Sequence, residues 1–352
     1  MRNALFALLF VACAALVACG GGGGGSPVTP TAAGATSAPS PATSTTPSPS
    51  PSPSSAPPAA ASITEYAIPT ASSAPEGIVA GPDGALWFAA YDAIERVTTA
   101  GAFTQYPMPG SSGSMNAIVV GSDNALWFTD TASNEIGRIT TAGAITTYPV
   151  PTASSAPMQI AAGSDGALWF TEFAGNAIGR ITTGGSISQY PLPAANGGPF
   201  GITSGPDHAL WFTESTGNAI GRITTAGAIA EYPLPTANAS PDGIVTGPDG
   251  ALWFVELTAD KIGRITTSGT ITEYPIPTSG SDPSSISVGA DGALWFTELT
   301  GNNIGRITTA GAITEYPIPT AGAGAEGVTS GPDGALWFTE AYANKIGRIV
   351  PP

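Results

Sequence analysis

Acidic side chains recur at two fixed distances from the tryptophans of this chain. Three residues after a tryptophan stand Ala90, Asp130, Glu172, Glu214, Glu256, Glu298 and Glu340. Eleven residues before a tryptophan stand Glu76, Asn116, Met158, Phe200, Asp242, Ser284 and Glu326. Carboxylate oxygens are the ligands that Mg²⁺ and Ca²⁺ select, and they also attract organic cations. The pattern indicates cation binding, or else a charge that the repeat copies where a strand ends in solvent.

The remaining residue types exclude other chemistry. His208 is the only histidine, and it takes the place that glycine has in the Asp-Gly turns of other repeats. Without a second histidine or a cysteine beside it, a tetrahedral zinc site and a Ser-His or Cys-His pair are excluded. We therefore treat His208 as a turn residue and expect no organic cofactor.

Seven tryptophans mark the repeat that must position the acids. Trp87 and Trp127 are 40 residues apart, and every later neighbouring pair is 42 residues apart. In the repeat around Trp211 we expect strands at 201–205, 209–214, 219–224 and 228–235. Asp-Gly pairs such as Asp249-Gly250 predict a hairpin turn between the first two strands. Four strands in about 40 residues is the period of a β-propeller blade.

The two ends of the array predict that the ring closes. The last repeat stops after its third strand, near Val350, and lacks the ITEYPIP segment that follows earlier third strands. A related segment, ITEYAIP, lies instead at 63–69. A last blade that takes its outer strand from the N-terminal side leaves no open edge. The sequence therefore predicts an all-β, seven-bladed propeller of four-stranded blades over 63–352.

Both sets of acids are expected at one rim of this ring. The first and second strands of a blade are antiparallel, so the start of the first lies beside the end of the second. Because blades six, seven and one are neighbours in a closed ring, Glu298, Glu326, Glu340 and Glu76 should form a cluster at the channel mouth. Mg²⁺, Ca²⁺ or a cationic small molecule or peptide would suit that cluster. We assign Asp242 and Ser284, at the same rim, to substrate binding.

The basic residues leave an alternative open. Lys261 and Lys345 stand across a hairpin from Glu256 and Glu340, where a surface pair is worth about 0.2–1 kcal/mol. The third-strand arginines lie three residues further along, within reach of another blade. The acids would then belong to a solvated rim of ion pairs.

Net charge limits the partners. The sequence has ten Lys plus Arg against 25 Asp plus Glu, a formal net charge of −15. Such a surface repels nucleic acid phosphates and anionic lipid head groups. We expect a monomer that does not bind nucleic acid.

The first 62 residues predict export and attachment. Residues 1–19 contain Arg2, an apolar run and Leu16-Val17-Ala18-Cys19, which resembles the lipobox of bacterial lipoproteins. Cys19 would become the lipidated first residue; the alternative is an ordinary signal peptide cleaved near Ala18. Residues 20–62 are Gly, Pro, Ser, Thr and Ala in the main, a composition typical of a disordered tether. We expect an exported protein attached to the bacterial cell envelope through its lipid alone.

The repeat as a whole is similar to a known family. The segments PDGALWFTE, NKIGRIT and ITEYPIP resemble those of the virginiamycin B lyases, or streptogramin lyases, across 63–349. The resemblance implies a seven-bladed propeller that opens a cyclic depsipeptide by Mg²⁺-assisted elimination. In that family a histidine is the base and a glutamate fourteen residues later binds the metal. A second metal glutamate lies two residues before that histidine, and a substrate-binding histidine lies one blade earlier.

The family's site residues map onto this chain unevenly. The later metal position is Glu340, the base position is Glu326, the earlier metal position is Gly324 and the substrate histidine position is Ser284. Only Glu340 keeps the family's residue type. A carboxylate with a pKa of about 4 is a weak base for elimination, so Glu326 could serve only if burial raised its pKa. Three hypotheses follow: a ligand-binding propeller, a lyase with an altered site, and a structural or adhesive surface module.

Overall fold

The computed structural model describes residues 62–108 and 113–352. The predicted signal peptide, Cys19 and the predicted tether up to residue 61 lie outside these residues. Within the described ranges the regular secondary structure is all β, and no helix is long and apolar enough to cross a membrane.

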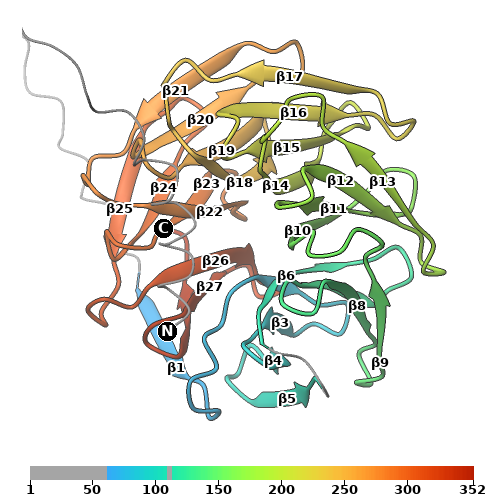
Figure 1. Ribbon diagram of the computed structural model, residues 1–352. Helices are drawn as coiled ribbons and strands as arrows, with labels where there is room; N and C mark the ends of the chain where they lie inside the picture. The colour runs from blue at the N-terminus through green and yellow to red at the C-terminus, as the bar shows by residue number, and fades with distance from the viewer. Residues whose placement is uncertain (1–61, 109–112) are drawn as a thin grey trace, which may run out of the picture. The chain divides into compact units, whose positions relative to one another are not determined.

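The described strands form seven four-stranded antiparallel sheets, arranged as the blades of a ring (Figure 1). This arrangement confirms the predicted seven-bladed β-propeller. In the blade of Trp211 the strands are Pro199–Ser204, Leu210–Glu214, Ala219–Ile223 and Ile229–Pro233, within about two residues of the predicted bounds. His208 and Asn124 have φ angles of 62° and 56°, as expected of residues in the place of a turn glycine.

Each blade contributes one strand to each of four concentric positions. The first strands are β2 (Ile78–Ala80), β6 (Met115–Val120), β10 (Pro157–Ala162), β14 (Pro199–Ser204), β18 (Pro241–Thr246), β22 (Pro283–Val288) and β26 (Ala325–Ser330). The second strands are β3 (Leu86–Ala89), β7 (Leu126–Asp130), β11 (Leu168–Glu172), β15 (Leu210–Glu214), β19 (Leu252–Glu256), β23 (Leu294–Glu298) and β27 (Leu336–Glu340). The third strands are β4 (Ala93–Val97), β8 (Glu135–Ile139), β12 (Ala177–Ile181), β16 (Ala219–Ile223), β20 (Lys261–Ile265), β24 (Asn303–Ile307) and β28 (Lys345–Ile349). The fourth strands are β5 (Phe103–Pro107), β9 (Ile145–Pro149), β13 (Ile187–Pro191), β17 (Ile229–Pro233), β21 (Ile271–Pro275), β25 (Ile313–Pro317) and β1 (Ile63–Ala67). We number the blades 1 to 7 from β2, so that blade 7 contains β26, β27, β28 and β1.

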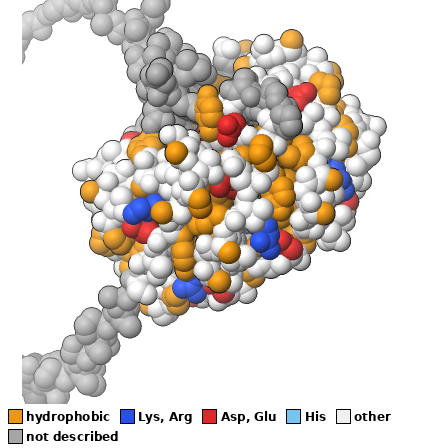
Figure 2. Space-filling model, turned by 90° about the horizontal axis from the view of Figure 1, so that it is seen from below, with side chains coloured by type: hydrophobic (Ala, Val, Ile, Leu, Met, Phe, Trp, Pro, Cys, Tyr) orange, Lys and Arg blue, Asp and Glu red, His pale blue; other side chains and the backbone are white. Residues whose placement is uncertain are grey.

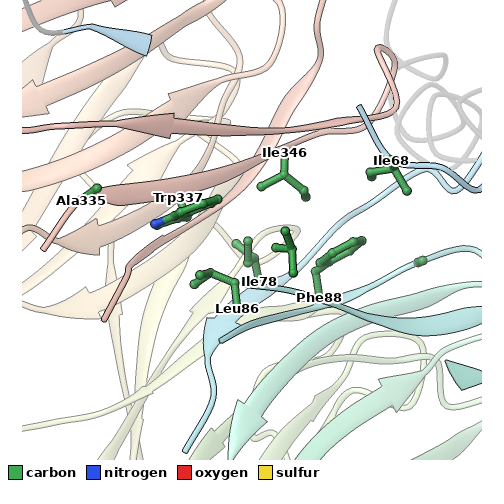
Figure 3. Packing of buried hydrophobic residues seen from close by; sticks show 9 residues of the cluster. Ile68, Ile78, Leu86, Phe88, Ala335, Trp337 and Ile346 are labelled. Carbon is green, nitrogen blue, oxygen red and sulfur yellow. The ribbon is translucent and has the colours of Figure 1, made fainter. Parts of the chain in front are cut away.

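The ring closes through its N-terminal strand, as predicted. β1 pairs antiparallel with β28 from Ile63 opposite Ile349 to Ala67 opposite Lys345. The blades on either side of this closure pack together, and Figure 3 shows Trp337 of blade 7 beside Ile78 of blade 1. These contacts join the two ends of the array into one circle.

The tryptophans organise the interior, as blade 4 illustrates. Trp211 is 0% exposed and stacks on Tyr232 of the fourth strand, with 5.6 Å between the ring centroids. Its Nε1 donates to Asp207 Oδ1 at 3.0 Å, and Arg222 Nε donates to Asp207 Oδ2 at 2.7 Å. Burial alone would raise the pKa of Asp207, but these two hydrogen bonds hold it below its ordinary value. The turn aspartate therefore fixes both the tryptophan and the arginine.

Side chains of a second strand alternate between the two neighbouring blades. Leu210 and Phe212 pack in the cluster that contains Trp169 of blade 3, whereas Trp211 packs with residues of blade 5. Thr213 also faces blade 5, because its Oγ1 donates to the carbonyl oxygen of Asp242 at 2.8 Å. By the same alternation, Glu214, the next residue of the strand, faces blade 3. This alternation decides where the second-strand acids lie.

Candidate ligand site at the upper face of the ring

The first strands form the innermost circle of the ring, because each contacts the first strands of both neighbouring blades. We call the upper face the end of the ring at which second strands turn into third strands and fourth strands lead into the next blade. The first strands begin at this face: Pro199 of β14 pairs with Glu214, the last residue of β15. The residues eleven before each tryptophan therefore lie at this end of the inner circle. We call them the mouth residues: Glu76, Asn116, Met158, Phe200, Asp242, Ser284 and Glu326.

On one side the mouth residues are polar and linked. Asn116 Nδ2 donates to Glu76 Oε2 at 3.0 Å, and Gln159 Nε2 donates to Asn116 Oδ1 at 3.2 Å. Next to them the mouth becomes apolar, since Met158 is buried and Phe200 meets Phe173 edge to face with 6.3 Å between the rings. An acidic and amide-bearing side thus adjoins an aromatic side.

The predicted substrate-binding residues Asp242 and Ser284 both lie at this face and are half-buried. Burial raises the pKa of Asp242 well above its ordinary value, although part of the residue still contacts solvent. Burial therefore favours the neutral form of the Asp242 carboxyl group, which can donate a hydrogen bond.

Blades 7 and 1 each carry an exposed tyrosine just after the second strand. Tyr342 is 51% exposed and Tyr91 is 42% exposed, whereas the other large aromatic side chains of the described chain are more covered. Burial, followed by the charges of Glu326 and Asp282, raises the pKa of the Tyr342 hydroxyl. Those two carboxylates therefore lie close to an exposed aromatic ring.

The tyrosine of blade 7 covers a glycine of special conformation. Gly324 has a φ of +68°, and a Cβ built there would lie 2.5 Å from Cγ of Tyr342. Any larger residue at 324 would be strained by the backbone angle and would displace this ring. Tyr91 of blade 1 covers another glycine of positive φ, Gly113, which precedes the first strand of blade 2.

The second-strand acids do not line the mouth, which corrects our prediction. The six side chains are 0–1% exposed, so they neither form a channel rim nor end a strand in solvent. The physical reason is strand alternation, which continues the face of the buried leucine and phenylalanine to the acid at the strand end. Of the predicted metal residues, Glu298 and Glu340 are consequently buried, whereas Glu76 and Glu326 are half-buried mouth residues.

Several of these buried carboxyl groups lack a hydrogen-bond partner. Both Oε atoms of Glu256 and Glu340 are without one among the described residues, as is Oε1 of Glu172, Glu214 and Glu298. Burial, together with the charge of a nearby fourth-strand glutamate, raises the pKa of Glu214, Glu256, Glu298 and Glu340 to about 7. These groups are therefore poised to change charge near neutral pH.

The basic residues do not form the ion pairs with second-strand acids or with other blades that the sequence left open. Each described Arg bonds the turn aspartate of its own blade, at 2.6–2.8 Å, and not an acid of another blade. Lys261 and Lys345 bind the fourth-strand acids Glu273 and Glu65, at 2.7 and 2.8 Å, and not Glu256 and Glu340. In the side view of Figure 2, blue basic groups accordingly lie beside red acidic groups. Every Lys and Arg of the described chain is thus already held by a carboxylate.

A compact metal centre is not supported in the described residues, because no group of three or more His, Cys, Asp and Glu could hold a metal ion. The sole histidine, His208, lies in the turn between first and second strands, at the end of the ring opposite the mouth. The position is the one that the sequence predicted.

Comparison with known proteins now gives the family. The model of the virginiamycin B lyase family matches residues 58–206 and 189–352. The chain belongs to the virginiamycin B lyase family. A structure of streptogramin B lyase is 42% identical, covers 82% of this chain and 97% of its own, and superposes with a TM-score of 0.79. Comparison with curated proteins found no match.

Two further family structures are from Staphylococcus aureus. Selenomethionine-substituted virginiamycin B lyase is 43% identical over 83% of this chain and 100% of its own, with a TM-score of 0.80. A catalytically inactive His-to-Ala variant of that enzyme, solved with quinupristin, is 42% identical over the same shares, with a TM-score of 0.80.

The residues present do not fit the Mg²⁺ site that virginiamycin B lyases imply. At the earlier metal position stands Gly324, which has no carboxylate, and the ring of Tyr342 covers the place of its Cβ. At the later position Glu340 is 0% exposed. The base position holds Glu326, so the chain also lacks the histidine base of the family.

Proposed function

We propose that this protein is a binding member of the virginiamycin B lyase family that takes a cationic small molecule or peptide at the mouth of its ring. The observation that carries the proposal is the pairing of exposed Tyr342 with Glu326 and Asp282 at the upper face. An aromatic ring beside carboxylates favours an amine or guanidinium group through cation–π and charge interactions.

Charge complementarity supports a cation as the ligand. The nine described basic side chains are each paired with an acid, while the sequence holds 25 acids in total. The surplus of negative charge attracts cations to the ring and speeds their association at low salt. The apolar side of the mouth, with Phe200, suits the organic part of an amphipathic ligand.

Binding without catalysis is consistent with the relatives. The Staphylococcus aureus enzyme with its histidine changed to alanine is catalytically inactive and was solved with quinupristin. Since the resemblance places the family's base at Glu326, this chain also lacks that histidine. The second candidate, a lyase with an altered site, would need Glu326 to act as the base.

We also propose that the protein is exported and anchored. Lipidation at Cys19 holds it to the cell envelope, and residues 20–62 act as a tether. The ring would work as a monomer that faces its ligand with the upper face. A structural or adhesive role would instead require no ligand at the mouth.

Calorimetric titration tests the proposal. The purified protein is titrated with an Arg-rich amphipathic peptide, with MgCl₂ and with CaCl₂. We expect peptide binding that weakens at least about tenfold in Glu326→Gln and in Tyr342→Ala, since a desolvated cation–π contact or charge pair is worth about 1–2 kcal/mol. Glu135→Gln, an acid on the third strand of blade 2 away from the inner circle, is the control and should bind as the unaltered protein does. No peptide binding, or equal binding by all variants, would refute a cationic ligand at this mouth.

A further inference from the structure

Blades 4, 5, 6 and 7 each have a buried second-strand glutamate and a half-buried fourth-strand glutamate on one face of the blade. In blade 4 the register sets Glu214 opposite Ala219 and Gly221 opposite Glu231. Directly opposite residues point to the same face of a sheet, as do residues two apart along a strand. Glu214, Ala219 and Glu231 therefore share the face that meets blade 3. The Phe212 ring covers Gly221 on this face, because a Cβ there would lie 2.1 Å from the ring.

In blade 5 a lysine supplies a positive charge on this face. Lys261 stands opposite Glu256, in the place of Ala219. Its Nζ donates to Glu273 Oε2 at 2.7 Å and to Thr236 Oγ1 of the preceding connection at 2.6 Å. The ammonium group thus joins the outer glutamate of one blade to its neighbour.

Blade 7 repeats this arrangement with different residues. Lys345 Nζ donates to Glu65 Oε2 at 2.8 Å and to Thr320 Oγ1 at 2.6 Å. Two blades of the same repeat therefore place one ammonium group at the same point, between the outer glutamate and a threonine, on the face that the inner glutamate shares.

Blade 4 keeps the acids but not the cation. Ala219 replaces the lysine and Ala194 replaces the threonine, so that Glu231 Oε1 accepts only the Ala194 amide, at 3.2 Å. Glu214 is 1% exposed, and its Oε1 has no partner among the described residues. The register places Glu231 on the same face as Glu214, and its charge, second to burial, raises the pKa of Glu214.

Neutral donors fill this role in two other blades. Gln189 Nε2 donates to Glu172 Oε2 at 2.6 Å in blade 3, and Asn303 Nδ2 donates to Glu298 Oε2 at 3.0 Å in blade 6. Among the described residues, blade 4 is thus the blade whose two glutamates receive no hydrogen bond from a lysine or amide side chain.

We propose that blade 4 binds a monovalent cation, K⁺ as the inorganic case, between Glu214 and Glu231, at the point where blades 5 and 7 hold a lysine ammonium group. Ala219 lacks the aminopropyl part of a lysine side chain, and the ion would take the place of its ammonium group. A single charge fits because the repeat is built around one ammonium. Ca²⁺ would bring a second positive charge that the ammonium groups of blades 5 and 7 do not have.

Thermal unfolding of the full protein at pH 8 tests this site, with 100 mM KCl compared with 100 mM tetramethylammonium chloride at equal ionic strength. A site with a Kd of about 10 mM would raise the folding equilibrium constant about 11-fold in KCl. For a ring of this size, that corresponds to a Tm higher by about 2 °C. Equal Tm values in the two salts would overturn the proposal.

A variant that builds in the cation gives the decisive comparison. Ala219→Lys copies blades 5 and 7, so we expect a higher Tm in tetramethylammonium chloride and no further gain from K⁺. Ala177→Lys, at the equivalent position of blade 3 where Gln189 replaces the outer glutamate, is the matched control and should keep the full response to K⁺. A K⁺ response that persists in Ala219→Lys would place the ion elsewhere.

Two further measurements keep the claim testable if a variant fails to fold. Crystals of the unaltered protein soaked in rubidium chloride should show an anomalous peak between Glu214 and Glu231, and the absence of a peak would overturn the site. A larger Tm gain from 1 mM CaCl₂ than from 100 mM KCl would overturn the choice of a monovalent ion.

Discussion

The buried glutamates of blades 5, 6 and 7 should make the ring less stable as pH rises through neutrality. Burial raises the pKa of Glu256, Glu298 and Glu340 from 4.5 to about 7, and the charges of Glu273, Glu315 and Glu65 act in the same direction. A folded-state pKa above the unfolded one means that the native protein binds protons more tightly. This tighter proton binding stabilises the folded protein fully below about pH 4.5, and the stabilisation is lost as pH rises through about 7.

The size of the effect follows from the shift. About 2.5 pKa units at 1.36 kcal/mol per unit give about 3.4 kcal/mol per group as an upper bound. Water penetration and side-chain relaxation reduce such penalties, so we expect about 1 to 2 kcal/mol per group. Three groups then remove about 3 to 6 kcal/mol between pH 5 and pH 8, a large part of a typical stability of 5–15 kcal/mol.

Urea unfolding at pH 5.0, 6.5 and 8.0 measures this loss. The turn aspartates do not mask it, because their pKa values lie below the ordinary 3.8 and their contribution is lost only in stronger acid. The triple variant Glu256→Gln/Glu298→Gln/Glu340→Gln should flatten the pH profile and be more stable than the unaltered protein at pH 8. Glu135→Gln should leave the profile unchanged. Stability that is constant or rises from pH 5 to pH 8, or a triple variant with an unaltered slope, would refute the reasoning.

Three further outcomes are expected. Removing the chain before Gly77 deletes β1 and exposes the edge of β28, so the Tm should fall and aggregation should increase; an unchanged Tm and solubility would contradict closure by β1. Cys19→Ser should move the protein from the detergent phase to the aqueous phase on phase partitioning, whereas continued partitioning with membranes would contradict lipidation. Incubation with a streptogramin B and Mg²⁺ should give no efficient ring opening, because the loss of a general base alone costs about 10² to 10⁴ in rate; efficient opening would show that Glu326 serves as a base.

The repeat could be predicted from sequence because its signals are local. The tryptophan spacing and the Asp-Gly turns predict the blade, and the misplaced ITEYAIP segment predicts the pairing of β1 with β28 that the ring contains. The partner of each third-strand arginine could have been found in the same way. Asp207 lies just before β15 and Arg222 near the end of β16, and because these strands are antiparallel the two residues meet at the same end of the pair.

The orientation of the second-strand acids was harder to predict, although the signal was present. Leu210, Phe212 and Glu214 occupy alternate positions, which assigns all three to one face. A charged residue at a strand end is nonetheless commonly solvent-exposed. That general expectation led us to place these acids around the channel mouth, whereas they are buried between blades. What hides Glu214 is the turn and the connection that pack over it from two blades, a contact between Gly197 and Gly217 that no local pattern contains.

Blade 7 joins these findings into an account of how the site diverged from that of the lyases. Gly324 accommodates the ring of Tyr342 and a φ of +68°, so a metal-binding glutamate cannot simply be restored there. Glu326 then stands near an exposed aromatic ring rather than beside a metal ligand. We therefore expect Glu326→His with Gly324→Glu to gain no lyase activity while Tyr342 is present, and to lose affinity for a cationic peptide. Ring opening of a streptogramin by that double variant would show that Tyr342 does not block the metal position.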